Sequence, residues 1–322
     1  MLKYFLLLLS GKVKEMNKMN KLGIVLIIMA LAGCTANPPK QEIKIGILPI
    51  EDALPIVVAE QEGIFSKHGL NVEIIKFQSA LERDSALTAN ELHAVITDPV
   101  AVILLREAGY NMKIVSLCLG KTPEEGVFAI LASPNSSVSS VKDLEGRKIA
   151  ISSNTIIEYI TDSLLREYDV NAEKIEVKKI PIRMQMLLDD KVEAATLPEP
   201  LASLAVHKGA KLIVSDAMLN KSISQTVIAF REDFIRENPQ AIEKFLQAYK
   251  EAVEKINSQP SKYRSLFIEI ARVPEPIANS YPMPTYPEPE PLGKENFLSV
   301  YEWAKNKGLI KKEISYEDII YD

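Results

Sequence analysis

Small polar side chains stand where this sequence predicts that strands end and helices begin. Apolar runs alternate with amphipathic stretches, and a polar joint follows several of the predicted strands. Helix N-termini at such joints offer unpaired N–H groups and the positive end of a dipole to a ligand. The candidate ligand-binding residues of this type are Ser79, Thr97, Ser152, Ser153, Asn154 and Thr155. Each one alone is explained by an ordinary helix cap, so only their convergence predicts a site.

Four carboxylates occupy the same joints and set the expected charge of a ligand. Glu51, Asp52, Asp98 and Glu199 each follow a predicted strand. An unpaired carboxylate repels a bound anion strongly where the dielectric constant is low. Arg83 and Arg183 lie near these joints and could neutralise some of the acids, and a solvated loop or a helix cap is the alternative role. We therefore expect a neutral or amine-bearing organic ligand over a simple inorganic anion, with the compound itself left open.

The sequence gives no support for catalytic, metal or nucleic-acid chemistry. It contains no G-x-S-x-G, H-E-x-x-H or C-x-x-C motif. His68, His93 and His207 fall on separate predicted elements, so they are not expected to share a metal. The net charge of −5 lacks the basic excess of a nucleic-acid-binding protein. No catalytic residue, metal, cofactor or nucleic-acid partner is expected.

Strand and helix patterns alternate along the chain and predict an α/β fold with parallel sheets covered on both faces. Residues 55–69 predict one helix that ends at Gly69, and residues 112–119 predict a buried strand. The alternation restarts near Glu125 and becomes mostly helical after residue 231. The proline-rich stretch 273–291 is either a recognition segment for a partner or an ordered loop, with candidate anchors Ile277, Tyr281, Met283 and Tyr286.

Two stretches one hundred residues apart share a pattern and predict two similar lobes. Residues 87–103 and 187–204 each run from a helix end through a short strand to a helix start that carries proline and an acid. Chance similarity of two strand–helix units is the alternative. We expect lobe 1 to comprise residues 42–130 and 224–322, and lobe 2 to comprise residues 131–223. The chain would then cross twice between the lobes, and two crossings make a hinge.

The N-terminal region has the order of a secretory signal. Lys18 and Lys21 precede an uncharged run at residues 22–33, which is too short to span a bilayer. A buried core helix is the alternative. The run ends at Leu31-Ala32-Gly33-Cys34, which resembles the lipobox of bacterial lipoproteins and implies acylation of Cys34. Residues 1–33 are thus a predicted signal peptide and residues 34–41 a tether. Cys118, the other cysteine, is expected to be a buried core residue without a disulfide partner.

Four further motifs resemble one family in the same order along the chain. They are "VVAEQEGIFSKHGLNVEIIKFQSA", "SVKDLEGRKIAISSNT", "EAATLPEPLASLAVHKG" and "REDFIRENPQAIEKFLQAYKEA". They resemble type II periplasmic binding proteins, in the branch of nitrate, sulfonate, taurine and thiamine-precursor solute-binding proteins. The branch often has Trp before the Glu-Pro pair, where this chain has Leu197-Pro198. That difference removes an aromatic side chain from the expected pocket.

The resemblance implies a two-lobed fold with a ligand cleft between the lobes and a role in transport. The expected protein is the extracytoplasmic substrate-binding component of an ABC importer, anchored to the cell membrane by lipid at Cys34. Its implied partners are a small-molecule solute, the permease and its ATPase, and the resemblance implies a monomer. An enzyme of thiamine-pyrimidine or menaquinone synthesis on the same fold is the alternative, although such enzymes are cytosolic. A surface sensor or adhesin also stays open.

Overall fold

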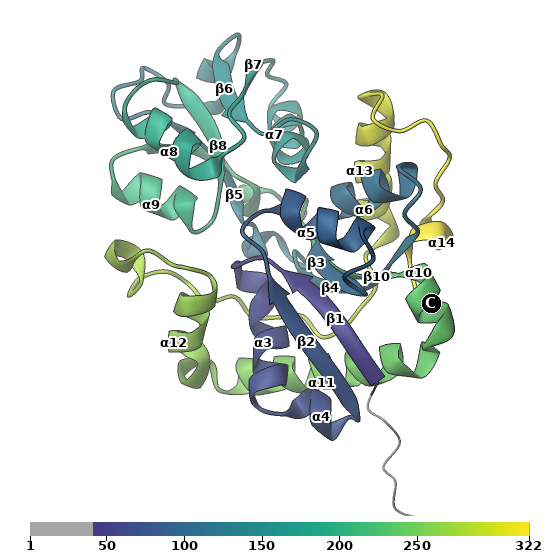
Figure 1. The fold of residues 1–322 in the computed structure, drawn as a ribbon. Coiled ribbons are helices and arrows are strands. Elements are labelled where there is room, and N and C mark those ends of the chain that lie inside the picture. Colours follow the sequence, from purple (N-terminus) through teal and green to yellow (C-terminus); the bar gives the residue numbers. More distant parts are fainter. Residues whose placement is uncertain (1–40, 322) are drawn as a thin grey trace, which may run out of the picture. The chain divides into compact units, whose positions relative to one another are not determined.

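The computed structural model describes residues 41–321, which form two five-stranded sheets (Figure 1). The predicted signal peptide and Cys34 lie outside these residues. The first sheet has the order β2-β1-β3-β10-β4 and the second the order β7-β6-β8-β5-β9. Their strands are β1 (Gln41–Ile47), β2 (Leu70–Lys76), β3 (Ala94–Thr97), β4 (Met112–Leu119) and β10 (Thr226–Arg231), then β5 (Phe128–Ala132), β6 (Lys148–Ile151), β7 (Glu173–Glu176), β8 (Ala194–Pro198) and β9 (Lys211–Ser215). We use "lobe 1" for the first sheet with the helices packed on it and "lobe 2" for the second.

Both sheets are mixed, so the expectation of parallel sheets was wrong. Strand β10 runs antiparallel to β3 and β4, and β5 runs antiparallel to β8 and β9. A parallel neighbour needs a crossover connection, usually a helix. No α-helix precedes either strand where the chain passes from one sheet to the other, at residues 120–127 and 216–225. Each strand therefore enters its new sheet from the end at which the parallel strands finish.

Helices cover both faces of each sheet. They are α3 (Leu54–Gln61), α4 (Ile64–Lys67), α5 (Ala80–Thr88), α6 (Pro99–Glu107), α7 (Ile156–Glu167), α8 (Ile180–Leu188), α9 (Leu201–His207), α10 (Glu232–Glu237), α11 (Pro239–Ser258), α12 (Pro260–Ile270), α13 (Lys294–Asn306) and α14 (Tyr316–Ile319). Two helices, α3 and α4, replace the single one expected at 55–69, because Gly63 adopts a left-handed φ of 68° between them. None of the helices in the described part of the chain has the length and apolarity that a bilayer-spanning segment needs.

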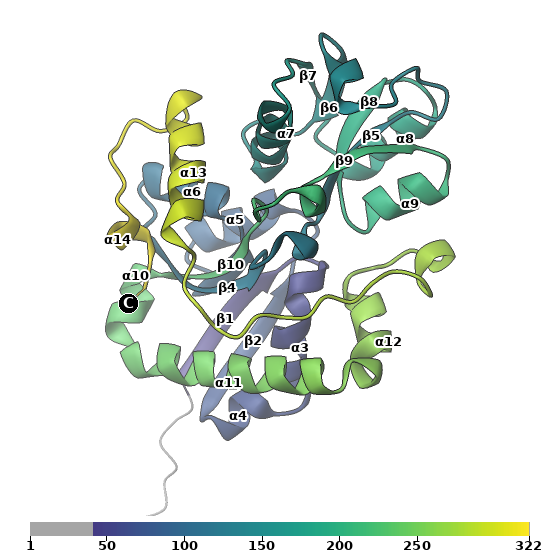
Figure 2. The same cartoon turned by 180° about the vertical axis from the view of Figure 1, so that it is seen from behind.

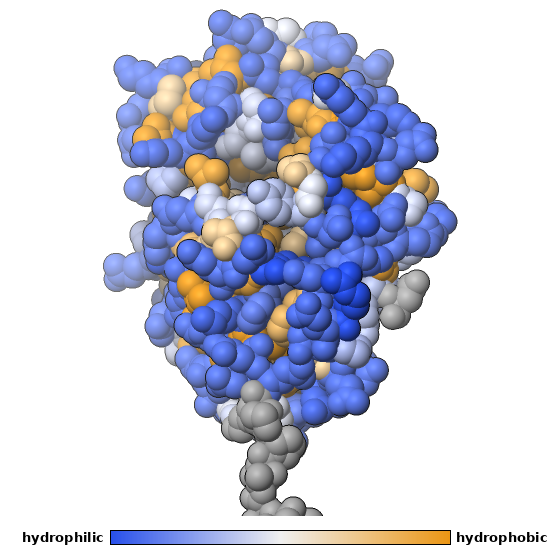
Figure 3. Space-filling view, turned by 45° about the vertical axis from the view of Figure 1, so that its right-hand side comes forward, coloured by the Kyte–Doolittle hydropathy of each residue, from blue (hydrophilic) through white to orange (hydrophobic). Residues whose placement is uncertain are grey.

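Three apolar cores hold the layers together. Residues of α3, α11 and α12 pack on one face of the first sheet, and α8 and α9 pack on one face of the second. The remaining core contains α5, α6 and α13 together with α7, and so it joins residues of both lobes. Cys118 is free and fully buried in the first of these cores, as expected. The exposed side chains seen in Figure 3 are mostly hydrophilic, with hydrophobic ones in small separate groups.

The two lobes repeat the same local arrangement at a spacing of one hundred residues. In lobe 1, β1 pairs with β2 and with β3 in parallel, with Ala94 opposite Ile45. In lobe 2, β6 pairs with β7 and β8 in parallel, with Ala194 opposite Ile149. The short alanine-containing strands predicted at 87–103 and 187–204 thus hold equivalent places. The carboxyl ends of these parallel strands lead to the joints that carry the predicted site residues.

The two passages between the sheets lie against each other. Asp216, in the turn Asp216–Met218, accepts hydrogen bonds from the backbone N–H groups of Val127 and Phe128. A Cβ on Gly126 would lie 2.4 Å from the backbone nitrogen of Ala217, so the approach of the chains requires glycine there. Whether these passages act as the predicted hinge, and whether the boundaries at residues 130 and 223 separate moving bodies, stays a prediction.

The proline-rich stretch is an ordered segment along lobe 1. Figure 2 shows the chain between α12 and α13 running across the molecule beside α11. Ile277, Tyr281 and Tyr286 are buried, and Met283 is half-buried. The ordered-loop interpretation is therefore confirmed, and the segment brings two tyrosine hydroxyls to Glu51.

A second set of contacts joins α13 to α7 of lobe 2. The indole N–H of Trp303 donates to Asp162 at 2.9 Å, and Lys307 Nζ lies 2.5 Å from Glu158 Oε1. The Tyr159 ring meets Trp303 edge-on with centroids 5.5 Å apart. Glu158 is 4% exposed, so loss of Lys307 would remove a cation from a buried carboxylate. Any movement of the lobes must preserve or break these contacts as well as bend the two passages.

Candidate functional site

The four predicted acids lie at the carboxyl ends of parallel strands and come from both lobes. Glu51 and Asp52 lie in the 3-10 turn Glu51–Ala53 shortly after β1, and Asp98 follows β3 directly. Glu199 follows β8 in lobe 2. Ligands of open α/β sheets bind outside these strand ends. Helix α9, which follows Glu199, packs on the turn Glu275–Ile277 of the proline-rich segment, and Tyr281 of that segment donates to Glu51. The like charges of Glu199 and Asp52 also raise the pKa of Glu51.

Glu51 is held by tyrosines from the proline-rich segment. The hydroxyl of Tyr281 donates to its Oε1, and the hydroxyl of Tyr286 donates to its backbone carbonyl at 2.7 Å. The residue is 9% exposed. Burial raises the pKa of Glu51 to about 7, the Tyr281 hydroxyl opposes that rise, and the charges of Glu199 and Asp52 add to it.

Asp52 is the most deeply buried acid of the group. It is 2% exposed, and neither of its carboxylate oxygens has a hydrogen-bond partner. Burial raises the pKa of Asp52 to about 7. The Thr226 hydroxyl lies close enough to lower this pKa without making a hydrogen bond of normal geometry, and the charge of Arg83 also lowers it. A buried carboxylate without partners is unusual in a protein interior and calls for a functional explanation.

Asp98 has the capping role that the sequence left open, and Arg83 stabilises its surroundings. Asp98 Oδ1 accepts the backbone N–H of Ala101 at 3.0 Å at the start of α6. Burial raises the pKa of Asp98 to about 6, while that hydrogen bond and the charge of Arg83 oppose the rise. Arg83 is itself buried and donates to the Ile96 carbonyl at 2.7 Å and to Thr97 Oγ1 at 2.9 Å.

Glu199 is half-buried at the start of α9. Its carboxylate accepts both the backbone N–H and the hydroxyl of Ser203, at 3.1 and 3.0 Å. Burial raises the pKa of Glu199 above its usual range, and the charge of Asp216 adds to the rise. Asp216, in the second passage between the sheets, is another buried acid close to this group.

The predicted hydroxyl residues are already bonded within the protein. Ser79 caps α5 by accepting the N–H of Glu82 at 3.2 Å, and Thr97 accepts from Arg83. In lobe 2, Thr155 caps α7, Ser152 accepts from Arg183 at 2.9 Å, and Ser153 and Asn154 give their N–H groups to Glu176 and Glu158. In the described part of the chain, no hydrogen bond or ion pair joins the Ser152–Thr155 group to the acids. Its role in ligand binding remains a prediction.

Arg183 is the lobe 2 counterpart of Arg83 but has fewer partners. It is fully buried and donates from Nη1 to Ser152 Oγ and to the Val177 carbonyl. Its Nε and Nη2 atoms have no partner. Burial lowers the pKa of Arg183 to about 10. The charge of Arg83 lowers the pKa of Asp52 and of Asp98, and the expectation that an arginine neutralises some of the acids stays a prediction.

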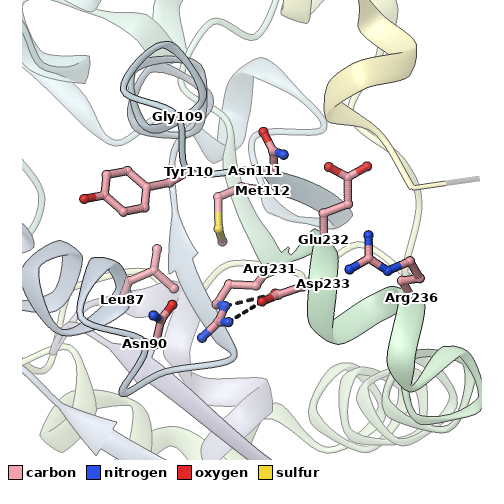
Figure 4. Close-up of a pocket in the computed structure, with 10 residues that line it drawn as sticks. All are labelled: Leu87, Asn90, Gly109, Tyr110, Asn111, Met112, Arg231, Glu232, Asp233 and Arg236. Atoms are coloured by element: carbon pink, nitrogen blue, oxygen red, sulfur yellow. Dashed lines mark hydrogen bonds and ion pairs between the residues drawn. The ribbon is translucent and has the colours of Figure 1, made fainter.

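Two surface pockets of lobe 1 lie away from the acids. One, of about 270 Å³, is lined by the end of α5, the start of β4 and the end of β10, where Arg231 pairs with Asp233 (Figure 4). These positions belong to the amino-terminal edge of the parallel strands, opposite to the edge at which such folds bind ligands. The other lies over α3 and β2. Neither pocket is lined by a predicted ligand residue.

Three residues near the acids were missed as site candidates. Tyr281 and Tyr286 were expected only as anchors of the loop, and Thr226 was not among the candidate residues. The two tyrosines lie 230 and 235 residues beyond Glu51, so no local spacing connects them. The usable signal was the pair of tyrosines inside a segment too rich in proline to be helical. In the described residues no group of three or more His, Cys, Asp or Glu side chains has the geometry to hold a metal ion.

Comparison with known proteins gives the family. The family model described as NlpA lipoprotein matches residues 43–271, which is more than half of the chain. The chain belongs to the NlpA lipoprotein family. The match covers β1 to the end of α12 and therefore includes all four acids and both arginines.

Relatives of this NlpA-family chain have names from solute transport. A candidate aliphatic sulfonates-binding protein of Bacillus subtilis is 25% identical over 92% of each chain. A candidate ABC transporter periplasmic binding protein of Brachyspira hyodysenteriae is 23% identical over 77% of this chain and 76% of its own. The crystal structure of the periplasmic aliphatic sulphonate binding protein SsuA from Escherichia coli superposes with a TM-score of 0.74 at 18% identity, covering 88% of this chain and 92% of that one. The two-lobed periplasmic binding protein fold is thereby confirmed.

Proposed function

We propose that this protein is the extracytoplasmic substrate-binding component of an ABC importer, which captures a small organic solute between its lobes and delivers it to a permease and its ATPase. The observation that carries the proposal lies at the carboxyl ends of the strands. There α9, the lobe 2 helix after Glu199, packs on the segment whose Tyr281 holds Glu51 of lobe 1. A solute bound there contacts both lobes at once. The transport names of the relatives support the same role.

Catalysis on the same fold is the alternative that we set aside. The site residues are carboxylates, hydroxyls and tyrosines, and Cys118 is fully buried, which suits a structural role better than that of a nucleophile. Burial raises the pKa of its thiol further above the ordinary value. A binding protein needs only to hold its solute and release it unchanged, and these residues suffice for that.

Solute binding is tested by the unfolding temperature of the purified chain. We expect at least one compound from a panel of sulfonates, nitrate, pyrimidines, vitamins and amines to raise it. Ligand at a hundredfold excess over Kd stabilises the folded state by about 2.7 kcal/mol, which corresponds to a rise of about 5 °C for a chain of this size. A panel without any stabilising compound contradicts the proposed function.

We also propose that the chain is a monomer held at the membrane surface by lipid on Cys34. The support is the charged, apolar and small-residue order before that cysteine, together with the family. A radioactive fatty acid supplied to cells should label the wild-type protein and leave a Cys34→Ala variant unlabelled. A Cys118→Ala variant is the matched control and should be labelled like the wild type. Equal labelling of the Cys34→Ala variant would exclude this anchor.

A further inference from the structure

The acids around Glu51 belong to both lobes, and Arg83 is a cation near two carboxylates of lobe 1. The charges of Asp52 and Glu199 act on Glu51, that of Asp98 acts on Asp52, and that of Asp216 acts on Glu199. The charge of Arg83 acts on Asp52 and Asp98, but its donors are already bound to Ile96, Thr97 and Asp84. Like charges at this depth raise the free energy of the unliganded site, because water screens them only weakly.

A second observation points to a ligand rather than to a solvated acidic patch. Both oxygens of Asp52 are buried without a partner, and so are the Thr226 hydroxyl beside it and the hydroxyl of Tyr249. Tyr249 lies beside Cys118 in the core of lobe 1, and the charges of Cys118 and Asp52 both act on its hydroxyl. A buried acceptor without a donor carries the full cost of its lost hydration. Exposure rises from Asp52, at 2%, to Glu51, at 9%, and then to the half-buried Glu199.

We propose that the solute carries a positively charged nitrogen group, an ammonium or an amidinium, which binds between the carboxylates of Glu51 and Asp52 in lobe 1 and of Glu199 in lobe 2. This inference rests on the proposed function and assigns the chemical class of its solute. An ammonium offers three N–H donors and an amidinium a planar pair, while ionised carboxylates only accept. Such a group supplies the donors that Asp52 lacks and neutralises the repulsion between the lobes.

The hydroxyl-bearing joints fit an anion less well than the sequence alone suggested. Ser79, Thr97 and Thr155 accept hydrogen bonds from the protein, and the N–H groups of Ser153 and Asn154 are occupied by Glu176 and Glu158. The opposing feature is Arg183, whose Nε and Nη2 are unpartnered. An anion such as a sulfonate would be expected to use these donors. A variant at Arg183 therefore tests the alternative that the solute is an anion.

The test compares charged probes on one set of variants at pH 7.5. Propylamine and benzamidine are the cationic probes, and ethanesulfonate and nitrate are the anionic ones, each titrated against the full chain while the unfolding temperature is measured. We expect a cationic probe to stabilise the wild type and to bind at least tenfold more weakly to Glu51→Gln, Asp52→Asn and Glu199→Gln. Glu302→Gln removes the same charge from an exposed position on α13 and should bind like the wild type. Without any probe, Glu51→Gln and Asp52→Asn should unfold at a higher temperature, because repulsion is relieved.

Each other outcome has a defined meaning. If only ethanesulfonate or nitrate stabilises the wild type, and Arg183→Met loses that stabilisation, the solute is an anion. This result overturns the inference and leaves the proposed function intact. Cationic stabilisation that survives in all three acid variants also overturns it, because the nitrogen then binds elsewhere. If neither cationic probe stabilises the protein while a neutral solute of the wider panel does, the inference is wrong and the function stands. If no compound of any class binds, the function itself is contradicted.

Discussion

Replacing Arg83 with methionine is expected to lower the free energy of unfolding by about 3 kcal/mol, whereas the same replacement of Arg183 lowers it by about 1 kcal/mol. The two arginines hold equivalent places in α5 and α8, one hundred residues apart, and both are buried. They therefore form a matched pair in which size, charge and local structure are the same. The difference between them lies in what each one neutralises and binds.

Arg83 has the larger expected effect because buried groups depend on it. It donates to the Ile96 carbonyl and to Thr97, pairs with Asp84 at 2.8 Å, and lies in the field of Asp52 and Asp98. Its loss leaves buried acceptors without a donor and the acids without a cation.

Arg183 contributes less because its own burial is incompletely compensated. Two of its three guanidinium nitrogens have no partner, and burial lowers the pKa of the side chain to about 10. Methionine removes the cost of burying that charge and offsets much of the lost hydrogen bonding. Urea unfolding of the two variants at pH 7 measures both values. Equal losses, or a larger loss for Arg183→Met, would contradict this account of the acids.

The unliganded protein should become less stable as the pH rises from about 4.5 to about 7. The pKa values of Glu51 and Asp52 are about 7 and that of Asp98 about 6 in the folded state, against about 4 in an unfolded chain. Between these values the folded chain holds protons that the unfolded chain releases. The stability that these groups contribute is therefore fully present below pH 4 and lost through pH 7, at about 1.4 kcal/mol per pH unit for each proton.

Acids with a lowered pKa act against this trend at low pH, and His93 acts against it closer to neutral pH. Salt bridges and hydrogen bonds from Lys262, Lys255 and Tyr263 lower the pKa of Glu62 to about 2, so its contribution changes only below pH 4.5. Burial lowers the pKa of His93, which gives one opposing proton, whereas burial raises the pKa of Glu199 and Asp216 and so adds to the trend. The slope of the urea-unfolding free energy between pH 5 and 7 should thus be negative in the wild type.

Variants identify the groups responsible for that slope. Between pH 5 and 7, the slope of the unfolding free energy should be markedly smaller in magnitude in the double variant Glu51→Gln/Asp52→Asn than in the wild type. The slope of Glu302→Gln should match that of the wild type. A wild-type slope that is zero or positive would show that these carboxylates are ionised in the folded protein at pH 5. If the slope of the double variant equals that of the wild type, groups other than Glu51 and Asp52 bind the protons that the folded chain retains.

The local elements could be predicted because their patterns are strong. Strand β4 occupies residues 112–119 as expected, and Ser79 and Asp98 cap α5 and α6. The hundred-residue repeat indicated two equivalent lobes. In agreement with it, Ala94 pairs with Ile45 in lobe 1 as Ala194 pairs with Ile149 in lobe 2. Such features depend on residues near in sequence, where hydrophobic period and capping preference act directly.

Features that depend on distant segments could not be predicted. Strands β5 and β10 run antiparallel to their neighbours because the chain enters each sheet from the other one. The amino-acid preferences of a strand do not contain that information. The tyrosines of the proline-rich segment reach Glu51 only through the path of the folded chain. The joints themselves were predicted, but the internal hydrogen bonds that occupy Ser153 and Asn154 depend on Glu176 and Glu158 in three dimensions.

The most direct test of a solute site between the lobes is hydrogen–deuterium exchange with and without the compound that most stabilises the protein. The account predicts slower exchange in both lobes at once, in residues 48–53 and 97–101 of lobe 1 and in residues 197–203 of lobe 2. This outcome is independent of the charge of the solute. Slower exchange confined to one lobe, or to residues 109–112 and 231–236 around the opposite pocket, would contradict it.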